Sequence, residues 1–411
     1  MTAVANPSDW LASDLFWKVR ADPRVAALAL VDRADAMPYF LPIGSPLDRE
    51  VVVDGVTVLM FGSNNYLGLA GDPRVRAAAK EAIDRYGTGC TGSRLMNGTL
   101  PLHQELEAEI ADWVRREAAV VFTAGYLANL SAVSTLCGPG DVVVSDVRNH
   151  ASLGDGARCS GADVVSVRHN DVAQLARKLE RLTAPGRAIL VAWDSVFSMD
   201  GDIAPLAEIA AVCRRHRARL LVDEAHSVGV AGPEAAGMSV GLDPAPDLIM
   251  GTFSKSLASC GGFIAGDRDV VDYLRVHAWP FLFTASSVPA AVGAALAALR
   301  ICRAEPWRAA RTREHAARLA AGLRAAGLDV TWGGAAVVSV AVADEWRALL
   351  VGRKLLEAGV YVNVGVFPAV PRGRAILRLS TTATHRDADV ERCIDTFASV
   401  AEAVKGVGHV R

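Results

Sequence analysis

The stretch Leu221-Val222-Asp223-Glu224-Ala225-His226-Ser227 ends an apolar run with an Asp-x-x-His pattern. Further along, Gly251-Thr252-Phe253-Ser254-Lys255-Ser256 places a lysine between hydroxyl side chains, shortly before the glycine pair at 261–262. A lysine amine can form a Schiff base with an aldehyde. A carboxylate beside a pyridine nitrogen keeps that ring protonated and electron-withdrawing. The two stretches together predict a site for pyridoxal 5'-phosphate (PLP), with Lys255 as its covalent anchor and Asp223 as the partner of the ring nitrogen.

Short apolar runs like the one before Asp223 recur along the chain and alternate with helical patterns. Most are apolar at nearly every position, as in a sheet that is covered on both faces. This alternation predicts an α/β fold with a mainly parallel, doubly wound sheet, whose functional groups lie at the carboxyl ends of the strands. The seven expected strands are 119–122, 142–145, 164–167, 188–193, 220–222, 248–250 and 263–265.

The pattern changes from about Pro289 onward. A long helical region rich in Ala and Arg is followed by shorter strands and helices, which predicts a smaller α+β domain. We therefore expect a PLP-binding large domain at 59–290 and a small C-terminal domain at 291–411. Residues 1–58 are expected to form an N-terminal segment that packs on the small domain and on a partner subunit.

Two further candidate groups follow strands. His226, three residues after Asp223, is expected to reach the phenolic oxygen of the cofactor or the substrate, although a structural core histidine fits the same pattern. Asp223 itself also fits the N-cap of a helix. Gly125 and Tyr126 open a helix after a strand, where backbone N–H groups can hold a phosphate.

Two more candidate site residues, a histidine and an arginine, lie in other segments of the chain. His150 follows the strand expected at 142–145, and its flat imidazole can stack on a pyridine ring. Arg378 lies inside an apolar strand pattern at 376–380. A buried arginine needs a partner, and the two alternatives are a bidentate grip on a substrate carboxylate and a structural salt bridge.

The bulk composition excludes several classes of protein. The 411 residues are 51% hydrophobic and carry a net charge of −2, which does not favour binding to nucleic acid or to an anionic membrane. Seven scattered cysteines without a Cys-x-x-Cys pattern indicate reduced thiols in a cytoplasmic protein, with neither a disulfide frame nor a metal site. The N-terminus lacks the pattern of a signal peptide. Two uncharged stretches, 118–140 and 276–299, are broken by polar residues, so no transmembrane segment is expected.

The motifs, taken in order, resemble those of the α-oxoamine synthase family of PLP enzymes over roughly residues 38–400. The resemblance implies a PLP-dependent transferase of fold type I that forms a homodimer with active sites at the subunit interface. It also implies decarboxylative condensation of an amino acid with an acyl thioester. The segments that carry it are Asn64-Asn65-Tyr66-Leu67-Gly68-Leu69, 87–94, Asn97-Gly98-Thr99, His103, 123–126, Asn149-His150-Ala151-Ser152, 196–202, Asp223-Glu224-Ala225-His226, Thr252-Phe253-Ser254-Lys255 and the strand of Arg378.

The resemblance also assigns roles to individual residues. Lys255 is the Schiff-base lysine and the catalytic base, and Asp223 pairs with the pyridine nitrogen. His150 stacks on the ring, while Ser198 and His226 flank its phenolic oxygen. The phosphate is expected to contact Gly125, Tyr126, Thr252 and, across the subunit interface, Thr284. The substrate is expected to contact Arg378, Asn65 and Ser93.

The identity of the substrates is less sharply predicted. Several stretches look most like bacterial serine palmitoyltransferase, and Ser93 stands where the glycine-specific members carry a bulkier Thr, which favours serine or alanine. An 8-amino-7-oxononanoate synthase or a secondary-metabolite synthase is the alternative, and the acyl carrier is either CoA or an acyl carrier protein. The pair Asp194-Ser195 departs from the Glu-Gly that is usual in relatives. A PLP aminotransferase, an aldolase and a catalytically silent partner subunit are the alternatives of other classes.

Overall fold

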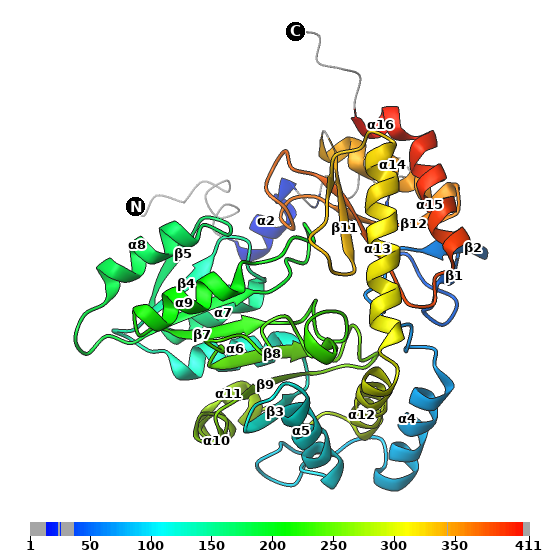
Figure 1. Ribbon diagram of the computed structural model, residues 1–411. Coiled ribbons are helices and arrows are strands. Elements are labelled where there is room, and N and C mark those ends of the chain that lie inside the picture. The colour runs from blue at the N-terminus through cyan, green and yellow to red at the C-terminus, as the bar shows by residue number, and fades with distance from the viewer. Residues whose placement is uncertain (1–13, 24, 26–36, 343, 406–411) are drawn as a thin grey trace, which may run out of the picture.

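The computed structural model describes residues 14–23, 25, 37–342 and 344–405 (Figure 1). Its largest sheet has seven strands in the order β3-β9-β8-β7-β6-β4-β5, and every strand expected from the sequence is present. β9 runs antiparallel to β3 and β8, and the other neighbouring pairs are parallel. The predicted mainly parallel sheet is confirmed. The strands are β3 (Ala118–Phe122), β4 (Val142–Asp146), β5 (Asp163–Val167), β6 (Ile189–Asp194), β7 (Arg219–Asp223), β8 (Leu248–Thr252) and β9 (Gly262–Gly266).

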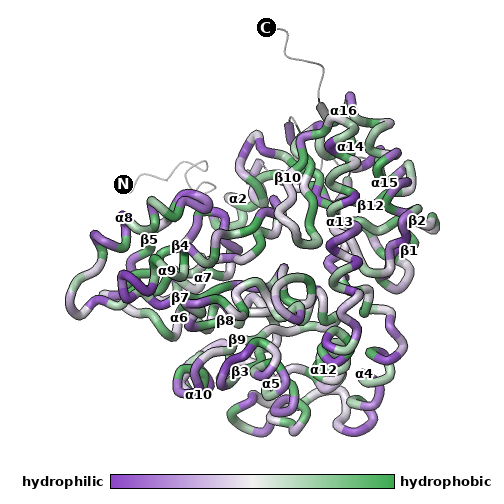
Figure 2. Tube along the Cα trace, in the orientation of Figure 1, coloured by the Kyte–Doolittle hydropathy of each residue, from purple (hydrophilic) through white to green (hydrophobic). Residues whose placement is uncertain are grey.

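Helices cover this sheet on both faces, which explains why most of its strands are apolar at nearly every position. Side chains of one strand alternate between two cores: Val120 packs with Ala128 and Leu153 on one face, while Val121 packs with Leu106 on the other. Figure 2 shows the hydrophobic strands inside more polar helices. The covering helices include α5 (Pro101–Trp113), α6 (Gly125–Leu136), α7 (Ala151–Ser160), α8 (Val172–Leu182), α9 (Leu206–Arg215), α10 (Arg268–His277), α11 (Trp279–Leu282) and α12 (Pro289–Ala304).

A second region combines both ends of the described chain. One antiparallel sheet has the order β10-β11-β14-β13, and a three-stranded sheet has the order β1-β2-β12. Because β12 pairs with β2, the early strands join the C-terminal region (Figure 1). The domain limits given above stay a prediction. The elements are β1 (Glu50–Val53), β2 (Val56–Met60), β10 (Val330–Thr331), β11 (Val337–Ala341), β12 (Val360–Tyr361), β13 (Asn363–Gly365), β14 (Ile376–Ser380), α13 (Trp307–Ala325), α14 (Glu345–Glu357), α15 (Asp387–Ser399) and α16 (Ala401–Lys405).

Two expectations from composition concern the whole chain. Among the helices that the structure describes, none combines the length and the apolar character needed to cross a membrane. All seven cysteines lie in the described ranges and none forms a disulfide.

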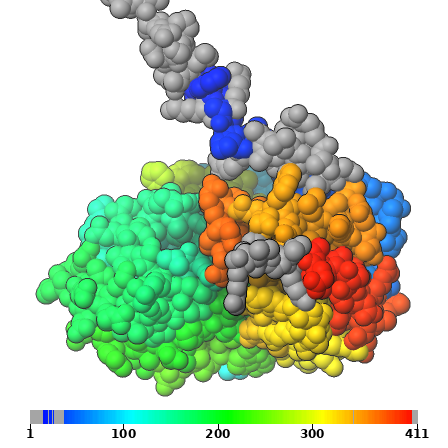
Figure 3. Space-filling view, turned by 90° about the horizontal axis from the view of Figure 1, so that it is seen from above, coloured from blue at the N-terminus to red at the C-terminus, as the bar shows by residue number. Residues whose placement is uncertain are grey.

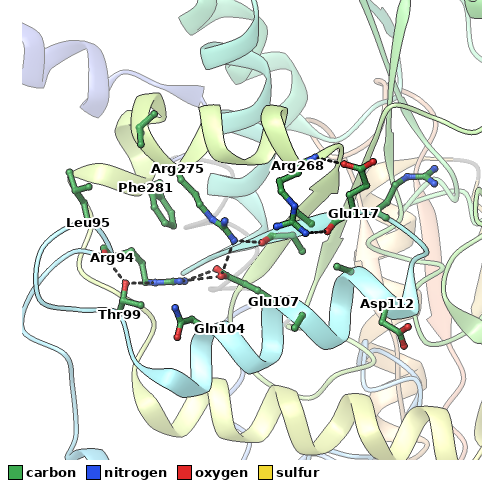
Figure 4. Close-up of a pocket in the computed structure, with 16 residues that line it drawn as sticks. Arg94, Leu95, Thr99, Gln104, Glu107, Asp112, Glu117, Arg268, Arg275 and Phe281 are labelled. Atoms are coloured by element: carbon green, nitrogen blue, oxygen red, sulfur yellow. Dashed lines mark hydrogen bonds and ion pairs between the residues drawn. The ribbon is translucent and has the colours of Figure 1, made fainter.

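A charged network lines a cavity of about 720 Å³ between α5, β3 and α10 (Figure 4). The buried carboxylate of Glu107 accepts hydrogen bonds from Arg94 at 2.8 Å, from Arg275 at 3.2 Å and from the backbone N–H of Val121 at 3.0 Å. None of the predicted site residues lines this cavity. Glu107 therefore links Arg94 in the 87–99 loop to Val121 in β3, at the edge of the sheet.

Replacing Glu107 is expected to destabilise the protein strongly. In Glu107→Ala, Arg94 loses a nearly buried partner, and breaking a buried pair in this way costs about 3–5 kcal/mol. Urea unfolding measures the difference from wild type. Glu105→Ala on the same helix is the matched control, since its pair with Arg300 is exposed and is worth about 0–1 kcal/mol. Equal losses in the two variants would contradict the assignment.

Candidate active site

The carboxyl ends of four parallel strands bring the candidate residues to one edge of the large sheet. Asp223 ends β7, and its register partner Asp194 ends β6. Thr252 ends β8 and leads directly to Lys255, while His150 follows β4 and caps α7. This placement agrees with the sequence prediction, since ligands of parallel α/β sheets bind at this edge.

Asp223 is held by a chain of hydrogen bonds that ends at His150. Nδ2 of Asn129 donates to Oδ2 of Asp223 at 2.6 Å and to Oγ of Ser152 at 2.9 Å. Oγ of Ser152 lies 2.7 Å from Nδ1 of His150, and the Ser152 backbone N–H also donates to that nitrogen. Nδ1 is thus the acceptor and the proton of the neutral ring lies on Nε2. Desolvation and the nearby Lys255 lower the pKa of His150, although Asp223 opposes the shift.

Lys255 lies in surroundings that favour a neutral amine. Desolvation lowers its pKa to about 8, against the opposing charge of Asp223 and with help from Arg378. Within the described residues, its Nζ has neither a hydrogen bond nor an ion pair. A neutral amine is the form that attacks a carbonyl and accepts a proton.

The pKa of Lys255 predicts how cofactor loading depends on pH. When protein freed of cofactor is mixed with PLP, the rate at which the visible Schiff-base absorbance appears is expected to rise with pH and to level off above about pH 8. The reason is that the fraction of neutral Lys255 rises through its pKa. Stopped-flow absorbance measures the rate, and a Lys255→Ala preparation gives the background. A rate that still climbs steeply up to about pH 10 would point to an unperturbed lysine.

A second cluster joins the large sheet to β14. Oη of Tyr66 lies 2.7 Å from Nδ1 of His226 and donates to Oδ1 of Asn64 at 3.1 Å. The same Asn64 oxygen accepts from Nη2 of Arg378 at 3.0 Å, and Nε of Arg378 donates to the backbone carbonyl of Ser198. Desolvation and the nearby Lys255 and Arg378 hold the pKa of His226 well below its usual range, so the ring is neutral.

Within the described residues, the contacts of Arg378 leave its positive charge without an anionic partner. Its side chain is 4% exposed, yet within the described residues its hydrogen bonds go only to neutral groups. A buried guanidinium without a carboxylate is costly. The structural salt bridge that the sequence allowed as an alternative is therefore absent from the described part of the chain. A carboxylate ligand would pair with the uncompensated positive charge of Arg378.

The start of α6 fits a phosphate group. The N-cap residue Ala124 provides no side-chain hydrogen bond, so the first N–H groups of this helix remain available. Glycine is required at 125, because a Cβ there would lie 2.9 Å from Oγ1 of Thr252. Oγ1 of Thr252 lies 2.8 Å from the hydroxyl of Ser254, which is exposed. Tyr126 packs edge-on against the His150 ring at 6.0 Å. These groups fit the phosphate and ring of PLP.

Comparisons with known proteins identify the relatives of this chain. The model of the family described as aminotransferase class I and II matches residues 56–397. Serine palmitoyltransferase of Sphingobacterium spiritivorum is 42% identical over 88% of this chain and 91% of its own length. A structure of serine palmitoyltransferase with a PLP internal aldimine superposes with a TM-score of 0.91 at 36% identity, covering 95% of this chain and 99% of that one.

The chain belongs to the α-oxoamine synthase family. The fold is accordingly fold type I of the PLP-dependent enzymes. A Mycobacterium tuberculosis protein named as an 8-amino-7-oxononanoate synthase is 48% identical over 84% of this chain, but the chain spans only 45% of its length. An 8-amino-7-oxononanoate synthase of Anaeromyxobacter is 44% identical and is covered over 94% of its length.

The substrate contact expected of Asn65 stays a prediction, and its side chain already makes hydrogen bonds within the chain. Oδ1 of Asn65 accepts from the backbone N–H groups of Leu69 and Ala70, and its Nδ2 donates to the carbonyl of Leu47. Its side chain is therefore committed to the backbone. The neighbouring Asn64 is the residue of this α-oxoamine synthase that faces Arg378.

The loops of Ser93 and Thr284 contact each other. Ser93 bridges Ala285, and the Ser286 backbone N–H donates to the carbonyl of Gly92 at 2.9 Å, so the two loops form one unit. In the described structure, neither residue forms a hydrogen bond with Lys255 or Arg378. Their roles stay predictions, and that of Thr284 depends on a second subunit.

Several residues of the site were not predicted from the sequence. Asn129 lies one helical turn after Gly125, so its spacing on the helix was the available signal. The Asp194-Ser195 pair was noted only as a departure from the family. Oγ of Ser195 donates to the Asp223 carbonyl at 2.9 Å, while Oδ2 of Asp194 accepts from the His150 backbone N–H at 3.1 Å. Burial and the neighbouring Asp223 raise the pKa of Asp194 well above its usual value.

Proposed function

We propose that this α-oxoamine synthase uses PLP to condense a small L-amino acid with an acyl thioester, releasing CO₂ and the free thiol. The observation that carries the proposal is Arg378, a buried guanidinium without an acidic partner in the described residues, in the cluster beside Lys255. It fits the carboxylate of an amino acid whose Cα would lie near the lysine. Homologues named for two such condensations support this reaction.

The protein's side chains have distinct tasks in this reaction. Bound PLP supplies the electron sink that stabilises negative charge at Cα. Asp223 keeps the ring nitrogen protonated, and the Asn129 amide fixes the Asp223 carboxylate. Lys255 holds the cofactor and then, as a neutral amine, accepts the Cα proton. Arg378 and Asn64 orient the substrate carboxylate until it leaves as CO₂.

The substrates are proposed from the family motifs. Ser93 favours an amino acid with a β-carbon, so serine or alanine is proposed, with an acyl-CoA or an acyl carrier protein as acyl donor. A serine palmitoyltransferase-like activity is proposed, and biotin-type or secondary-metabolite condensation is the alternative. We also propose a cytoplasmic location, since none of the seven cysteines is paired.

A homodimer with shared active sites is part of the proposal. Exposed apolar side chains lie around the loop of Thr284, among them Met96, Trp279 and Phe283. The helix α2 (Leu15–Arg20) also exposes Leu15 and Phe16, and Figure 3 shows this helix, in blue, standing off from the main body. A second copy that covers these surfaces would bring Thr284 to the phosphate site of its partner.

A matrix of serine, alanine and glycine against acyl-CoAs of several chain lengths tests the function. Purified protein loaded with PLP should release free thiol with one amino acid and a subset of thioesters, and the product should be an α-amino ketone. Nitrogen transfer without thiol release would favour an aminotransferase, and cleavage of a β-hydroxy amino acid would favour an aldolase. A protein that binds no PLP would be a silent partner subunit.

A further inference from the structure

His169 lies between two carboxylates outside the cluster around Lys255. Its Nδ1 is 3.1 Å from Oδ1 of Asp146 at the end of β4, and its Nε2 is 2.7 Å from Oδ2 of Asp202. Its ring also packs edge-on against Phe197, with centroids 4.4 Å apart. The adjacent Asn170 donates to the same two carboxylates. His169 thus holds both Phe197 and Asp202, which enclose Ser198 in the loop between them.

The loop from Phe197 to Asp202 leads directly to Arg378. The Phe197 backbone N–H donates to the Asp202 carbonyl at 3.0 Å, which closes the loop at its base. Next to this closure, the carbonyl of Ser198 accepts the hydrogen bond from Nε of Arg378. The position of this carbonyl therefore sets the orientation of the guanidinium. One continuous set of contacts runs from the His169 ring to the group that fits the substrate carboxylate.

Protonation strengthens the hydrogen bonds of His169 to Asp146 and Asp202. Burial opposes protonation, but hydrogen bonds to Asp146 and Asp202 raise the pKa of His169 to about 9. The protonated ring then donates to both carboxylates in charge-assisted hydrogen bonds. Two other charges lie on the same elements, Arg148 after β4 and Asp200 in the loop, and they pair with each other at 2.9 Å. They add a second tie between the loop and β4.

We propose that His169 is a positioning residue for substrate recognition, which fixes the Phe197–Asp202 loop so that the Ser198 carbonyl aims Arg378 at the amino-acid carboxylate. This inference rests on the proposed function. The ring itself touches neither Lys255 nor Asp223 through any hydrogen bond in the described structure. Its effect should therefore fall mainly on carboxylate recognition. Because Ser198, which is expected to flank the phenolic oxygen of the cofactor, lies in the same loop, the affinity for PLP should fall as well, but less than the affinity for the amino acid.

Matched ligands with and without a carboxylate test the proposal. Dissociation constants are measured from the change in cofactor absorbance for L-serine against ethanolamine, and for L-alanine against ethylamine. In His169→Ala, the dissociation constant of the amino acid should rise about 10-fold or more. With the protein saturated with PLP, the dissociation constant of the matched amine should stay within about twofold. Arg378→Ala should show the same selective loss.

A control variant separates positioning from a general loss of stability. Leu179→Ala removes a buried side chain from α8 in the same layer and should lower the unfolding midpoint without changing the preference for the carboxylate. If His169→Ala weakens amine and amino acid equally, or neither, the positioning role is wrong while the proposed function stands. If the wild-type protein itself does not prefer the amino acid over the amine, the carboxylate grip in the proposed function fails, and the inference falls with it.

Discussion

Lys255→Ala is expected to abolish the visible Schiff-base absorbance of the PLP-loaded protein and to lower condensation by about 10²–10⁴-fold or more. The variant loses both the covalent bond to the cofactor and the base that accepts the Cα proton. The Asp223 and phosphate contacts remain, so PLP should still bind without a covalent bond. Absorbance after gel filtration and thiol release measure the two effects.

The matched control for Lys255 is Lys80→Ala on α4 (Pro73–Tyr86), an exposed lysine on the same chain. It should retain both the absorbance and the activity of the wild-type protein. An unchanged spectrum in Lys255→Ala would refute the assignment of the lysine. Activity that survives after the absorbance is lost would instead show that another group takes the Cα proton.

Asp223→Asn is expected to lower kcat by about 10²–10³-fold while PLP remains bound through Lys255. A neutral amide cannot keep the ring nitrogen protonated, so the cofactor withdraws electrons less strongly. The substitution also places an amide opposite the Nδ2 donor of Asn129, which now donates to Asp223 at 2.6 Å. Steady-state thiol release gives kcat, and the deuterium isotope effect with Cα-deuterated substrate should increase as proton removal becomes slower.

The exposed carboxylate of Asp84 on α4 provides the control for Asp223. Asp84→Asn makes the same chemical change and should leave kcat and the isotope effect unaltered. If Asp223→Asn keeps its kcat, the ring nitrogen has another partner. The neighbouring Asp194 would then be the residue to replace next, because it pairs in register with Asp223.

The sequence was most informative where chemistry and strand position coincide. Asp223 and Lys255 follow strands that are apolar throughout, so both the sheet and the edge that carries them were predictable. Arg378 was predictable as a charge within an apolar strand. The prediction left its partner open, because the partner depends on which segments lie against β14. Within the described residues, the structure shows that Arg378 forms hydrogen bonds with neutral groups only.

Contacts between segments that are far apart in the chain could not be predicted from the sequence. Asn64 and Asn65 are adjacent and chemically identical, and only the backbone groups of Leu47 and Leu69 show which amide is occupied. His169 likewise lies in a surface-like sequence of polar residues, and its role becomes visible only when Asp202 approaches it from the chain 33 positions later. Register and loop closure decide such contacts, and neither has a periodic signal.

Lys255 and Arg378 belong to different sheets. Lys255 follows β8 of the seven-stranded sheet, whereas Arg378 lies in β14 of the smaller sheet. An amino acid held by both would join the two sheets through its own atoms. Occupancy and the relative orientation of the two sheets are then thermodynamically linked, so each must bias the other by the same free energy. An amine that lacks the carboxylate would bind beside Lys255 without making that connection.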